Sequence, residues 1–323
     1  MTIQRINLAF VGSGGWARKH HFPALDYLRK SPETADFELN LHGIYSLEPE
    51  VASAVADQYG FARVYSDLQA LIDDQAVNAV AVAVTPKAAA SVIEQLIVRR
   101  IPIFSEKPPG VSTEEAEKLS RIVDVPNVLA FNRRYEPLNN TFREIVDGME
   151  DITFVEGHFF RHHRLDEEFM IGTGIHWVNF MAYLFGEIRQ MRVARWQNPQ
   201  NETWLWVAHL IFEGGLRGIL KVFPCTGSDI ERVEVHTNES SAYLHGALSE
   251  YPGKIVIDSG KSRQTIDPQA EQQRPEIVRL GIVNEYLEFF QVVLDRATSR
   301  STFQNAVNSM RVAEAMQLGI DLV

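Results

Sequence analysis

The stretch INLAFVGSGGWA, residues 6–17, decides the fold of this 323-residue chain. Its first six residues are apolar except for Asn7, which is typical of a strand buried on both faces. Glycines follow at once, and a helix is predicted to continue from there to about Arg29. Such a turn lets the backbone approach a pyrophosphate, whose charge the amino terminus of the helix attracts. The candidate cofactor-binding residues of the turn are Gly12, Gly14, Gly15 and Trp16.

The pattern of a strand followed by a helix repeats through the first part of the chain. Alternation of this kind predicts right-handed crossovers and a parallel sheet. We therefore expect a doubly wound Rossmann domain of the α/β class at residues 1–125, with its boundary near the last predicted strand. The predicted strands cover residues 6–11, 37–45, 79–84, 101–104 and 128–131, and helices are expected near 17–29, 48–59, 66–73, 86–100 and from 112.

The second part of the chain, residues 126–323, has a different pattern. Its strand-like segments follow one another with short turns, which predicts a large, mainly antiparallel sheet in an α+β domain. Strands are expected at residues 152–161, 191–196, 204–212, 216–223, 232–237 and 255–258, and helices at 135–148, 174–185, 276–296 and 303–318.

The segment IPIFSEKPPG, residues 101–110, places a lysine directly after a short buried strand. Pro108 biases the backbone of Lys107 towards an extended form, and Pro109 stiffens the turn further. Ligands bind at the carboxyl ends of strands in open parallel sheets, so Lys107 is well placed to meet one. On these residues alone, a solvated turn lysine explains the pattern equally well.

The end of the second predicted strand bears on the choice between NAD and NADP. An acidic residue at this point often binds the ribose 2′-hydroxyl of NAD. The chain has Ser46 here, which would not repel a 2′-phosphate, but Glu48 could take the acidic role. Ser46 could equally cap the following helix, with Glu48 as an acid of its first turn. The sequence therefore leaves both dinucleotides open.

Four motifs, in this order, resemble the Gfo/Idh/MocA family of oxidoreductases, which includes glucose–fructose oxidoreductase and inositol dehydrogenase. They are GSGGWARKHHFPAL, AVAVTP, SEKPPG and FNRRYEP, which begin at residues 12, 81, 105 and 131. The resemblance implies that Lys107 faces both nicotinamide and substrate, and that Arg133 lies near the cofactor cleft. It also implies a second domain whose sheet walls the substrate site and often joins subunits. The residues that it implies to line the cofactor are Gly12, Gly14, Thr85, Pro86 and Glu106.

The predicted helix at residues 174–185, GIHWVNFMAYLF, is apolar on most sides and is therefore expected to be buried. His176, Asn179 and Tyr183 share one line on it, because they are three and four residues apart. Buried polar groups need partners, which either the protein or a polar ligand in a cleft supplies. We favour the cleft, because three polar residues form one stripe on a buried helix.

By the resemblance, His176 matches the catalytic histidine of the family. Many of its sugar and inositol dehydrogenases carry an aspartate four residues before this histidine and another three after it. This chain has Gly172 and Asn179 at those positions. The first aspartate would orient the imidazole as a general base, so without it proton abstraction would be weaker or another group would serve. The substitutes that the sequence offers, without ranking them, are Tyr135, His162, His163 and Asp166.

The run RHHR at residues 161–164 could bind an acidic group of a substrate or form a solvated strand end. Two adjacent histidines without further ligands at suitable spacing do not predict a metal site, and we expect none. The candidate substrate-binding residues are thus Lys107, His163, His176, Asn179 and Tyr183.

The composition narrows the class of protein. The formal net charge of −11 argues against nucleic acid as the main partner, since phosphate binding needs a basic surface. A single cysteine, Cys225, permits no intrachain disulfide. The amino terminus shows no long apolar signal region, and no apolar run is long enough to span a membrane. We expect a cytoplasmic protein that forms a homodimer or homotetramer through its C-terminal sheet.

The sequence thus predicts an NAD(P)-dependent oxidoreductase that moves hydride between nicotinamide and the carbinol or carbonyl carbon of a sugar, polyol or related small molecule. Lys107 would stabilise charge on the reacting oxygen, and His176 would exchange its proton. The alternative is a dinucleotide- and sugar-binding sensor without turnover, which the glycine at position 172 motivates. Hydride transfer to a non-sugar ring is a third hypothesis, which no residue of the chain selects.

Overall fold

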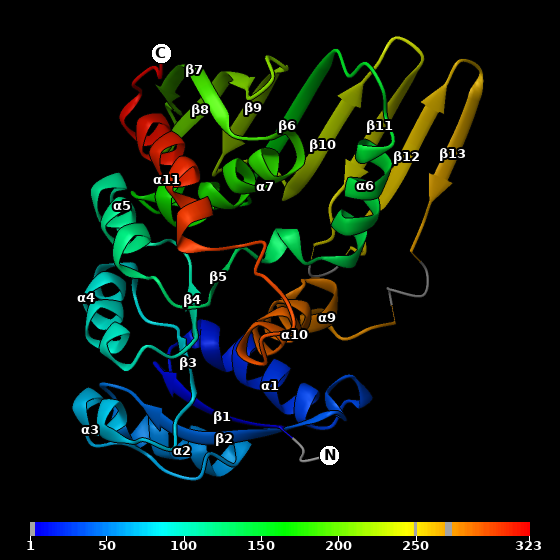
Figure 1. Cartoon of the computed structure of the whole chain (residues 1–323). Coiled ribbons are helices and arrows are strands. Elements are labelled where there is room, and N and C mark those ends of the chain that lie inside the picture. Colours follow the sequence, from blue (N-terminus) through cyan, green and yellow to red (C-terminus); the bar gives the residue numbers. More distant parts are fainter. Residues whose placement is uncertain (1–3, 249–250, 269–272) are drawn as a thin grey trace. The chain divides into compact units, whose positions relative to one another are not determined.

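The computed structural model describes residues 4–248, 251–268 and 273–323 (Figure 1). Two compact units make up the chain, and each draws on two places in the sequence. The first comprises Met1–Ala130 and Ile282–Val307, and the second Phe131–Gly281 and Asn308–Val323. These units divide the chain differently from the expected boundary after residue 125, because a last strand and a late helix both join the first unit. The expected boundary between two independently folding domains stays a prediction.

Five parallel strands form the sheet of the first unit, in the order β2-β1-β3-β4-β5. This order, with helices in the crossovers, confirms the predicted doubly wound α/β class. The strand expected at residues 101–104 lies two residues later, so Glu106 is its last residue. The strands are β1 (Gln4–Val11), β2 (Phe37–Tyr45), β3 (Ala79–Val82), β4 (Ile103–Glu106) and β5 (Asn127–Ala130).

Local signals in the sequence set the ends of several helices in this unit. Gly60, the predicted stop, ends a helix with a φ of +76°, which suits glycine. Ser112 begins another, because its Oγ accepts the Glu115 N–H at 3.3 Å. The helix after the glycines starts with a π-helical turn, Ala17–His21. The helices are α1 (Phe22–Arg29), α2 (Pro49–Tyr59), α3 (Leu68–Asp73), α4 (Pro86–Leu96), α5 (Thr113–Ile122) and α10 (Ile282–Val293).

Aromatic contacts show which helices cover which face of the parallel sheet. Phe10 of β1 packs on Phe22 of α1, with ring centroids 4.7 Å apart. Phe104 of β4 stacks on Tyr286 of α10 at 4.5 Å. Because α1 and α10 also contact each other, they cover the same face, while α4 and α5 lie on the other side of β3 and β4 (Figure 1).

Eight strands form the sheet of the second unit, in the order β13-β12-β11-β10-β6-β9-β8-β7. Among the described strands of this sheet, only the β6–β9 pair is parallel, which confirms a mainly antiparallel sheet. The sequence does not reveal β11 and β13, because both are rich in polar residues. The strands are β6 (Phe154–Phe160), β7 (Ile188–Gln197), β8 (Trp204–Phe212), β9 (Arg217–Phe223), β10 (Ile230–His236), β11 (Ser240–His245), β12 (Lys254–Ser259) and β13 (Ser262–Ile266).

Helices α6 (Pro137–Asp147) and α7 (Ile175–Phe185), with the later turns of α11 (Phe303–Leu318), share one hydrophobic core with this sheet (Figure 1). The prediction of a single helix at residues 276–296 is wrong. Its first part, α9 (Glu276–Arg279), ends before Gly281, whose φ of +78° interrupts the helix before α10. Among the described residues, no helix combines the length and apolar character needed to cross a bilayer.

A glycine in β6 brings α7 close to the sheet. A Cβ on Gly157 would lie 2.9 Å from Sδ of Met181 and 3.2 Å from Nε1 of Trp177, both on α7. Since real Cβ atoms essentially never approach to 2.9 Å and rarely to 3.2 Å, a larger residue at position 157 would displace these two side chains. Gly157 therefore allows α7 to pack closely on the sheet within the second unit.

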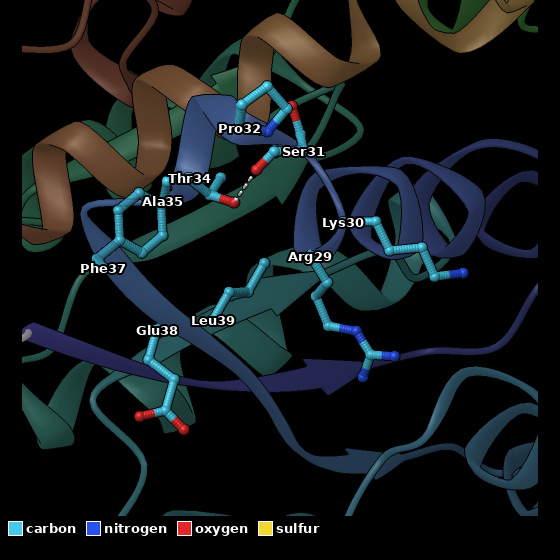
Figure 2. Close-up of a pocket in the computed structure, with 9 residues that line it drawn as sticks. All are labelled: Arg29, Lys30, Ser31, Pro32, Thr34, Ala35, Phe37, Glu38 and Leu39. Atoms are coloured by element: carbon cyan, nitrogen blue, oxygen red, sulfur yellow. Dashed lines mark hydrogen bonds between the residues drawn. The ribbon is translucent and has the colours of Figure 1, made fainter.

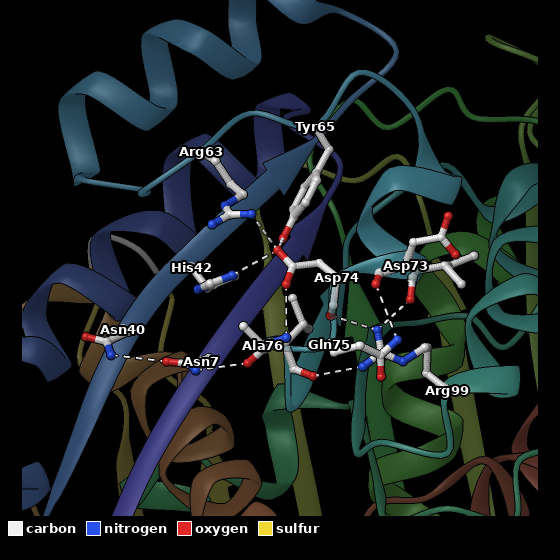
Figure 3. Close-up of polar contacts among 12 residues, drawn as sticks. Asn7, Asn40, His42, Arg63, Tyr65, Asp73, Asp74, Gln75, Ala76 and Arg99 are labelled. Atoms are coloured by element: carbon white, nitrogen blue, oxygen red, sulfur yellow. Dashed lines mark hydrogen bonds and ion pairs between the residues drawn. The ribbon is translucent and has the colours of Figure 1, made fainter.

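Asp74 ties the loop after α3 to β2 in the first unit (Figure 3). Its carboxylate accepts hydrogen bonds from His42 Nε2 at 3.0 Å, Arg63 Nη1 at 2.8 Å and the Tyr65 hydroxyl at 2.9 Å. The backbone N–H of Ala76 donates to the other oxygen at 2.9 Å. Burial alone would raise the pKa of Asp74, but these donors outweigh it and lower the pKa to about 2.

We expect Asp74→Asn to lower the free energy of unfolding at pH 7 by about 1–2 kcal/mol. The folded-state pKa of about 2 lies below the ordinary value of 3.8, so the stabilisation is complete above about pH 4 and is lost as the pH falls towards 2. Urea unfolding at pH 7 and pH 3 measures this difference, which should shrink at the lower pH. Asp73→Asn is the control, because that carboxylate accepts from Gln69 at the surface. Equal losses in both variants would contradict the role of Asp74.

Candidate active site

The carboxyl ends of β1, β2 and β3 meet at one edge of the parallel sheet, and the glycine turn lies there. The Gly12 N–H donates to the Tyr45 carbonyl at 2.8 Å, and the Ala83 N–H donates to the Val11 carbonyl at 2.9 Å. The predicted turn therefore stands at the edge where open parallel sheets bind their ligands.

The glycines of this turn have different tasks. Gly12 has a φ of +105°, and a Cβ there would lie 2.2 Å from the Ala83 carbonyl oxygen, so only glycine fits. Gly14 and Gly15 are exposed, and a Cβ on either meets no atom within 4 Å. Open space above these two residues, directly before the π-helical turn, fits the close approach of a pyrophosphate. Their role in binding stays a prediction.

The structure contradicts the interpretation of Ser46 as the N-cap of the next helix, because Glu48 holds that position and α2 begins at Pro49. Ser46 makes two other hydrogen bonds. Its Oγ accepts the Glu48 N–H at 3.3 Å, just before α2, and the Ser13 hydroxyl at 2.7 Å. The second bond joins the glycine turn to the end of β2. A contact between Ser46 and a ribose hydroxyl or phosphate stays a prediction.

The Glu106 carboxylate at the end of β4 is the centre of the polar contacts at this edge. Its Oε1 accepts from Trp16 Nε1 at 2.9 Å and lies 2.9 Å from His21 Nε2, and its Oε2 accepts the Lys107 N–H at 3.2 Å. Burial would raise the pKa of Glu106, but the hydrogen bond and charge of His21, the charge of Lys107 and the bond from Trp16 lower it below the ordinary value. The carboxylate is therefore ionised at neutral pH.

The neighbouring predicted residues take up positions that suit the same edge. The peptide bond between Lys107 and Pro108 is cis. Thr85 and Pro86 lie at the start of α4, directly beyond the end of β3. The structure thus brings the predicted residues of the first unit to the carboxyl edge of one sheet, while their contacts with a cofactor stay predictions.

In the second unit, the polar stripe of α7 lies beside a buried arginine. The Asn179 amide accepts from Arg134 Nε at 2.7 Å and donates to the Ser309 hydroxyl at 2.9 Å. The Tyr183 ring lies 5.1 Å from the Arg134 guanidinium carbon. His176 is 7% exposed and meets the Phe131 ring edge-on, with centroids 6.2 Å apart. Protein groups therefore partner Asn179 and Tyr183, and substrate contacts by the stripe stay a prediction.

Arg133 and Arg134 differ in a way that their adjacency in the sequence conceals. Arg134 is the partner of α7, and sequence reasoning missed it. Arg133 forms an ion pair with Glu231 at 2.5 Å and donates to Asn132 Oδ1 at 2.9 Å, and its predicted place near the cofactor cleft stays a prediction. On a strand, alternating burial would have predicted that one of these two arginines is buried and the other exposed. They lie in a 3₁₀ turn, where burial does not alternate from one residue to the next.

Arg133 belongs to a buried charge cluster with Arg161, Glu136 and Glu231. Glu231 accepts from both arginines, and burial raises the pKa of Glu136 to about 8, an effect that Arg133 opposes and the charge of Glu231 reinforces. The protonated form of Glu136 is therefore favoured, and Glu231 is the carboxylate that pairs with both arginines. These ion pairs hold the segment that follows β5 against β10 within the second unit.

The predicted substitutes for the missing aspartate lie in different surroundings. Tyr135 is fully buried, whereas His162, His163 and Asp166 are exposed after β6. Arg164 forms an ion pair with Asp166 at 2.5 Å. Gly172 lies in a π-helical turn before α7, where a Cβ would meet no atom within 4 Å. A side chain could therefore be added at position 172 without a clash.

Three possible metal ligands that the sequence did not predict lie together on the second sheet. Atoms of Glu156, His158 and Glu234 are within 4.8 Å of one another, because residues 156 and 234 pair across β6 and β10. Lys221 Nζ lies 3.0 Å from Glu156, and Arg232 Nη2 lies 3.0 Å from Glu234. These two cations already balance the carboxylates.

A cavity of about 620 Å³ lies elsewhere in the first unit (Figure 2). Arg29 and Lys30 flank it from the end of α1, and Phe37, Glu38 and Leu39 from the amino end of β2. The glycine turn lies at the carboxyl end of the same strand. The cavity is therefore separate from the candidate site.

A glycine turn at the carboxyl edge of a doubly wound parallel sheet defines the class of protein as one with a dinucleotide-binding Rossmann domain. The family model GFO_IDH_MocA, described as an oxidoreductase family with an NAD-binding Rossmann fold, matches residues 6–132. Over these residues the chain is similar to that family, which agrees with the resemblance seen in the sequence and with a nicotinamide dinucleotide as the cofactor. A comparison with curated proteins finds no match.

Solved structures share the fold over nearly the whole chain. A levoglucosan dehydrogenase in complex with NADH and levoglucosan matches with a TM-score of 0.84 and 16% identity, over 99% of this chain and 100% of that one. A dehydrogenase from Chromobacterium violaceum matches with a TM-score of 0.86 and 16% identity, over 99% of this chain and 96% of that one. UDP-N-acetylglucosamine 3-dehydrogenase from Acidithiobacillus ferrooxidans matches with a TM-score of 0.79 and 16% identity, over 99% of this chain and 98% of that one. At these identities the likeness shows the fold alone.

Proposed function

We propose that the protein is an NAD(P)-dependent dehydrogenase or reductase that acts on a CH–OH group, or the matching carbonyl, of a sugar, polyol or related small molecule. The observation that carries this proposal is the Glu106 carboxylate, which joins the glycine turn to the backbone of Lys107 at the end of β4. Two of the solved fold neighbours are sugar dehydrogenases, which favours a substrate of that class.

In this proposal, the glycine turn and the start of α4 hold the dinucleotide through Gly12, Gly14 and Thr85. The bound cofactor would supply or accept the hydride. The Lys107 ammonium donates a hydrogen bond to the reacting oxygen of the substrate and stabilises the negative charge that develops there. Glu106 keeps this ammonium oriented and charge-balanced.

His176 takes the hydroxyl proton of the substrate during oxidation and returns it during reduction. Neighbouring hydroxyls are bound by Asn179 and Tyr183, beside the Arg134 that both contact. His163 is the candidate for an acidic group of the substrate. A structure with cofactor and substrate bound tests the pair directly: Lys107 Nζ and a His176 ring nitrogen must both lie within about 3.2 Å of the reacting oxygen.

A substrate screen tests the proposal. The protein is first titrated with NAD, NADH, NADP and NADPH, and then mixed with the tighter-binding dinucleotide and a panel of sugars, polyols and keto-sugars. We expect one dinucleotide to bind at least about tenfold more tightly and at least one compound to change its absorbance. Binding of a dinucleotide and sugars without turnover would favour the alternative, a sensor of the same fold.

The variant Gly172→Asp tests whether the missing carboxylate limits the reaction. The space at position 172 admits the side chain, and a general base gains from a group that orients it. We expect kcat to rise about tenfold with the dinucleotide Kd unchanged, measured by absorbance. Gly172→Asn is the control, since it adds similar volume without charge. An equal effect of both variants would show that the carboxylate charge does not matter here.

We also propose a cytoplasmic location and a homo-oligomer that forms through the eight-stranded sheet. The face of this sheet away from α7 has half-exposed side chains, among them the stacked rings of Phe160 and Phe223, with centroids 4.6 Å apart. Light scattering gives the assembled mass. A monomer at all concentrations would remove the oligomer from the proposal.

A further inference from the structure

A hydrogen-bond chain extends from Glu106 away from the glycine turn into the core of the first unit. His21 lies 2.9 Å from Glu106 Oε1 through Nε2, and its other ring nitrogen, Nδ1, lies 2.9 Å from the Tyr286 hydroxyl on α10. Both His21 and Tyr286 are fully buried. Neither residue has a role in the mechanism proposed above.

The direction of each hydrogen bond in this chain follows from the chemistry of its members. Burial first, and then the charges of Glu106 and Glu285, raise the pKa of Tyr286 well above its ordinary value, so the hydroxyl keeps its proton. Glu106 is ionised and can only accept. The His21 tautomer that satisfies both neighbours accepts from the Tyr286 hydroxyl through Nδ1 and donates its Nε2–H to Glu106.

Packing fixes Tyr286, which is the end of the hydrogen-bond chain farthest from Glu106. Tyr286 stacks on Phe104, with ring centroids 4.5 Å apart and planes at 16°. It also meets the His21 ring edge-on at 5.7 Å. Phe104 precedes Glu106 by two residues on β4, so both side chains point to the same face of the sheet. α10 thus contacts the strand that ends in Glu106, directly before Lys107.

We propose that Tyr286 and His21 are positioning residues for Lys107. The chain from Tyr286 through His21 fixes the Glu106 carboxylate, which in turn holds the Lys107 backbone and balances its ammonium. The inference rests on the proposed role of Lys107 in hydride transfer, but its physical content is the fixed proton on His21 and the charge next to Lys107.

The charged and titratable groups around Glu106 determine what a break in the chain does. They are Lys107 directly after β4, His21 before α1, and Tyr286 with Glu285 on α10. Without the Tyr286 hydroxyl, nothing holds the His21 ring proton on Nε2, so the ring can carry it on Nδ1 instead. Glu106 then loses a fixed donor and its fixed position beside Lys107, and the ammonium is less strongly favoured.

The test uses the full chain with Tyr286→Phe, which keeps the stacked ring and removes the hydroxyl. The first readout is the tautomer of His21 from ring-nitrogen NMR shifts at pH 8. The second is acetic anhydride labelling of Lys107 against pH, followed by mass spectrometry. We expect the Nε2–H tautomer of His21 in the wild type and a mixture of both tautomers in Tyr286→Phe. The pH at which half of Lys107 is labelled should be about half a unit lower in the variant. Glu106→Gln should shift the labelling further in the same direction.

Tyr65→Phe is the matched control, because it also removes a tyrosine hydroxyl from a carboxylate of the first unit, at Asp74. This control should leave the tautomer and the labelling curve unchanged. With a substrate from the screen, Tyr286→Phe should lower kcat about fivefold to tenfold and move its pH profile, while the Kd for NADH stays within about twofold.

The outcomes separate the inference from the proposed function. An unchanged tautomer and labelling curve in Tyr286→Phe would overturn the inference, whatever the enzyme does. Shifted curves without turnover of any sugar would support the chain and count against the proposed function instead. Shifted curves with an unchanged kcat and pH profile would show that the chain does not position Lys107 for the reaction.

Discussion

Replacing Lys107 by alanine is expected to lower kcat by about 10²–10³-fold or more while changing the Kd for NADH by less than about threefold. The ammonium is the proposed donor to the reacting oxygen, and such a donor acts mainly on charge that develops in the transition state. Dinucleotide affinity instead depends on the glycine turn and the start of α4. Absorbance assays with the substrate from the screen, together with NADH titrations, separate these two quantities.

Two further variants sharpen this result. Lys107→Met keeps the length and apolar stem of the side chain, so equal losses in the alanine and methionine variants would assign the effect to the charge. Lys118→Ala, at an exposed lysine of α5 that pairs with Glu94, is the control and should leave kcat unchanged. Undiminished turnover in Lys107→Ala would remove Lys107 from the mechanism.

Which features could be predicted from the sequence depends on how far apart along the chain the interacting residues lie. The stop at Gly60 and the cap at Ser112 depend on neighbours within four residues, and both are confirmed. The break at Gly281 depends on a distant contact, because a Cβ there would lie 2.6 Å from the Asn132 carbonyl oxygen. Hydrophobic periodicity carries no information about such an approach, so one long helix was predicted where two exist.

The same distinction applies to the candidate site. The glycine turn and Lys107 could be found because their chemistry is local and strand ends of a parallel sheet converge. The partners of Glu106 could not, because Trp16 and His21 lie 90 and 85 residues away in the sequence. Arg134 was missed for a related reason, since Asn179, the residue that it contacts, is 45 residues away.

Gly12→Ala is expected to have the largest effect on stability. A φ of +105° is unfavourable for any residue with a Cβ, and this Cβ would lie 2.2 Å from the oxygen and 2.9 Å from the carbon of the Ala83 carbonyl. Ala83 cannot retreat easily, because its N–H is bonded to the Val11 carbonyl of β1. Strain and overlap together should cost about 3 kcal/mol or more, and NADH binding should be lost.

Gly14→Ala is the matched control, because its Cβ meets no atom within 4 Å and its backbone has no positive φ. Urea unfolding should show a change within about 0.5 kcal/mol, while the Kd for NADH rises about tenfold as the methyl group takes space meant for the pyrophosphate. The two variants thus separate the glycine that the fold requires from the glycine that the ligand requires. If Gly14→Ala bound NADH as tightly as the wild type, the dinucleotide would have to lie elsewhere, and Gly12 would be needed only for the turn.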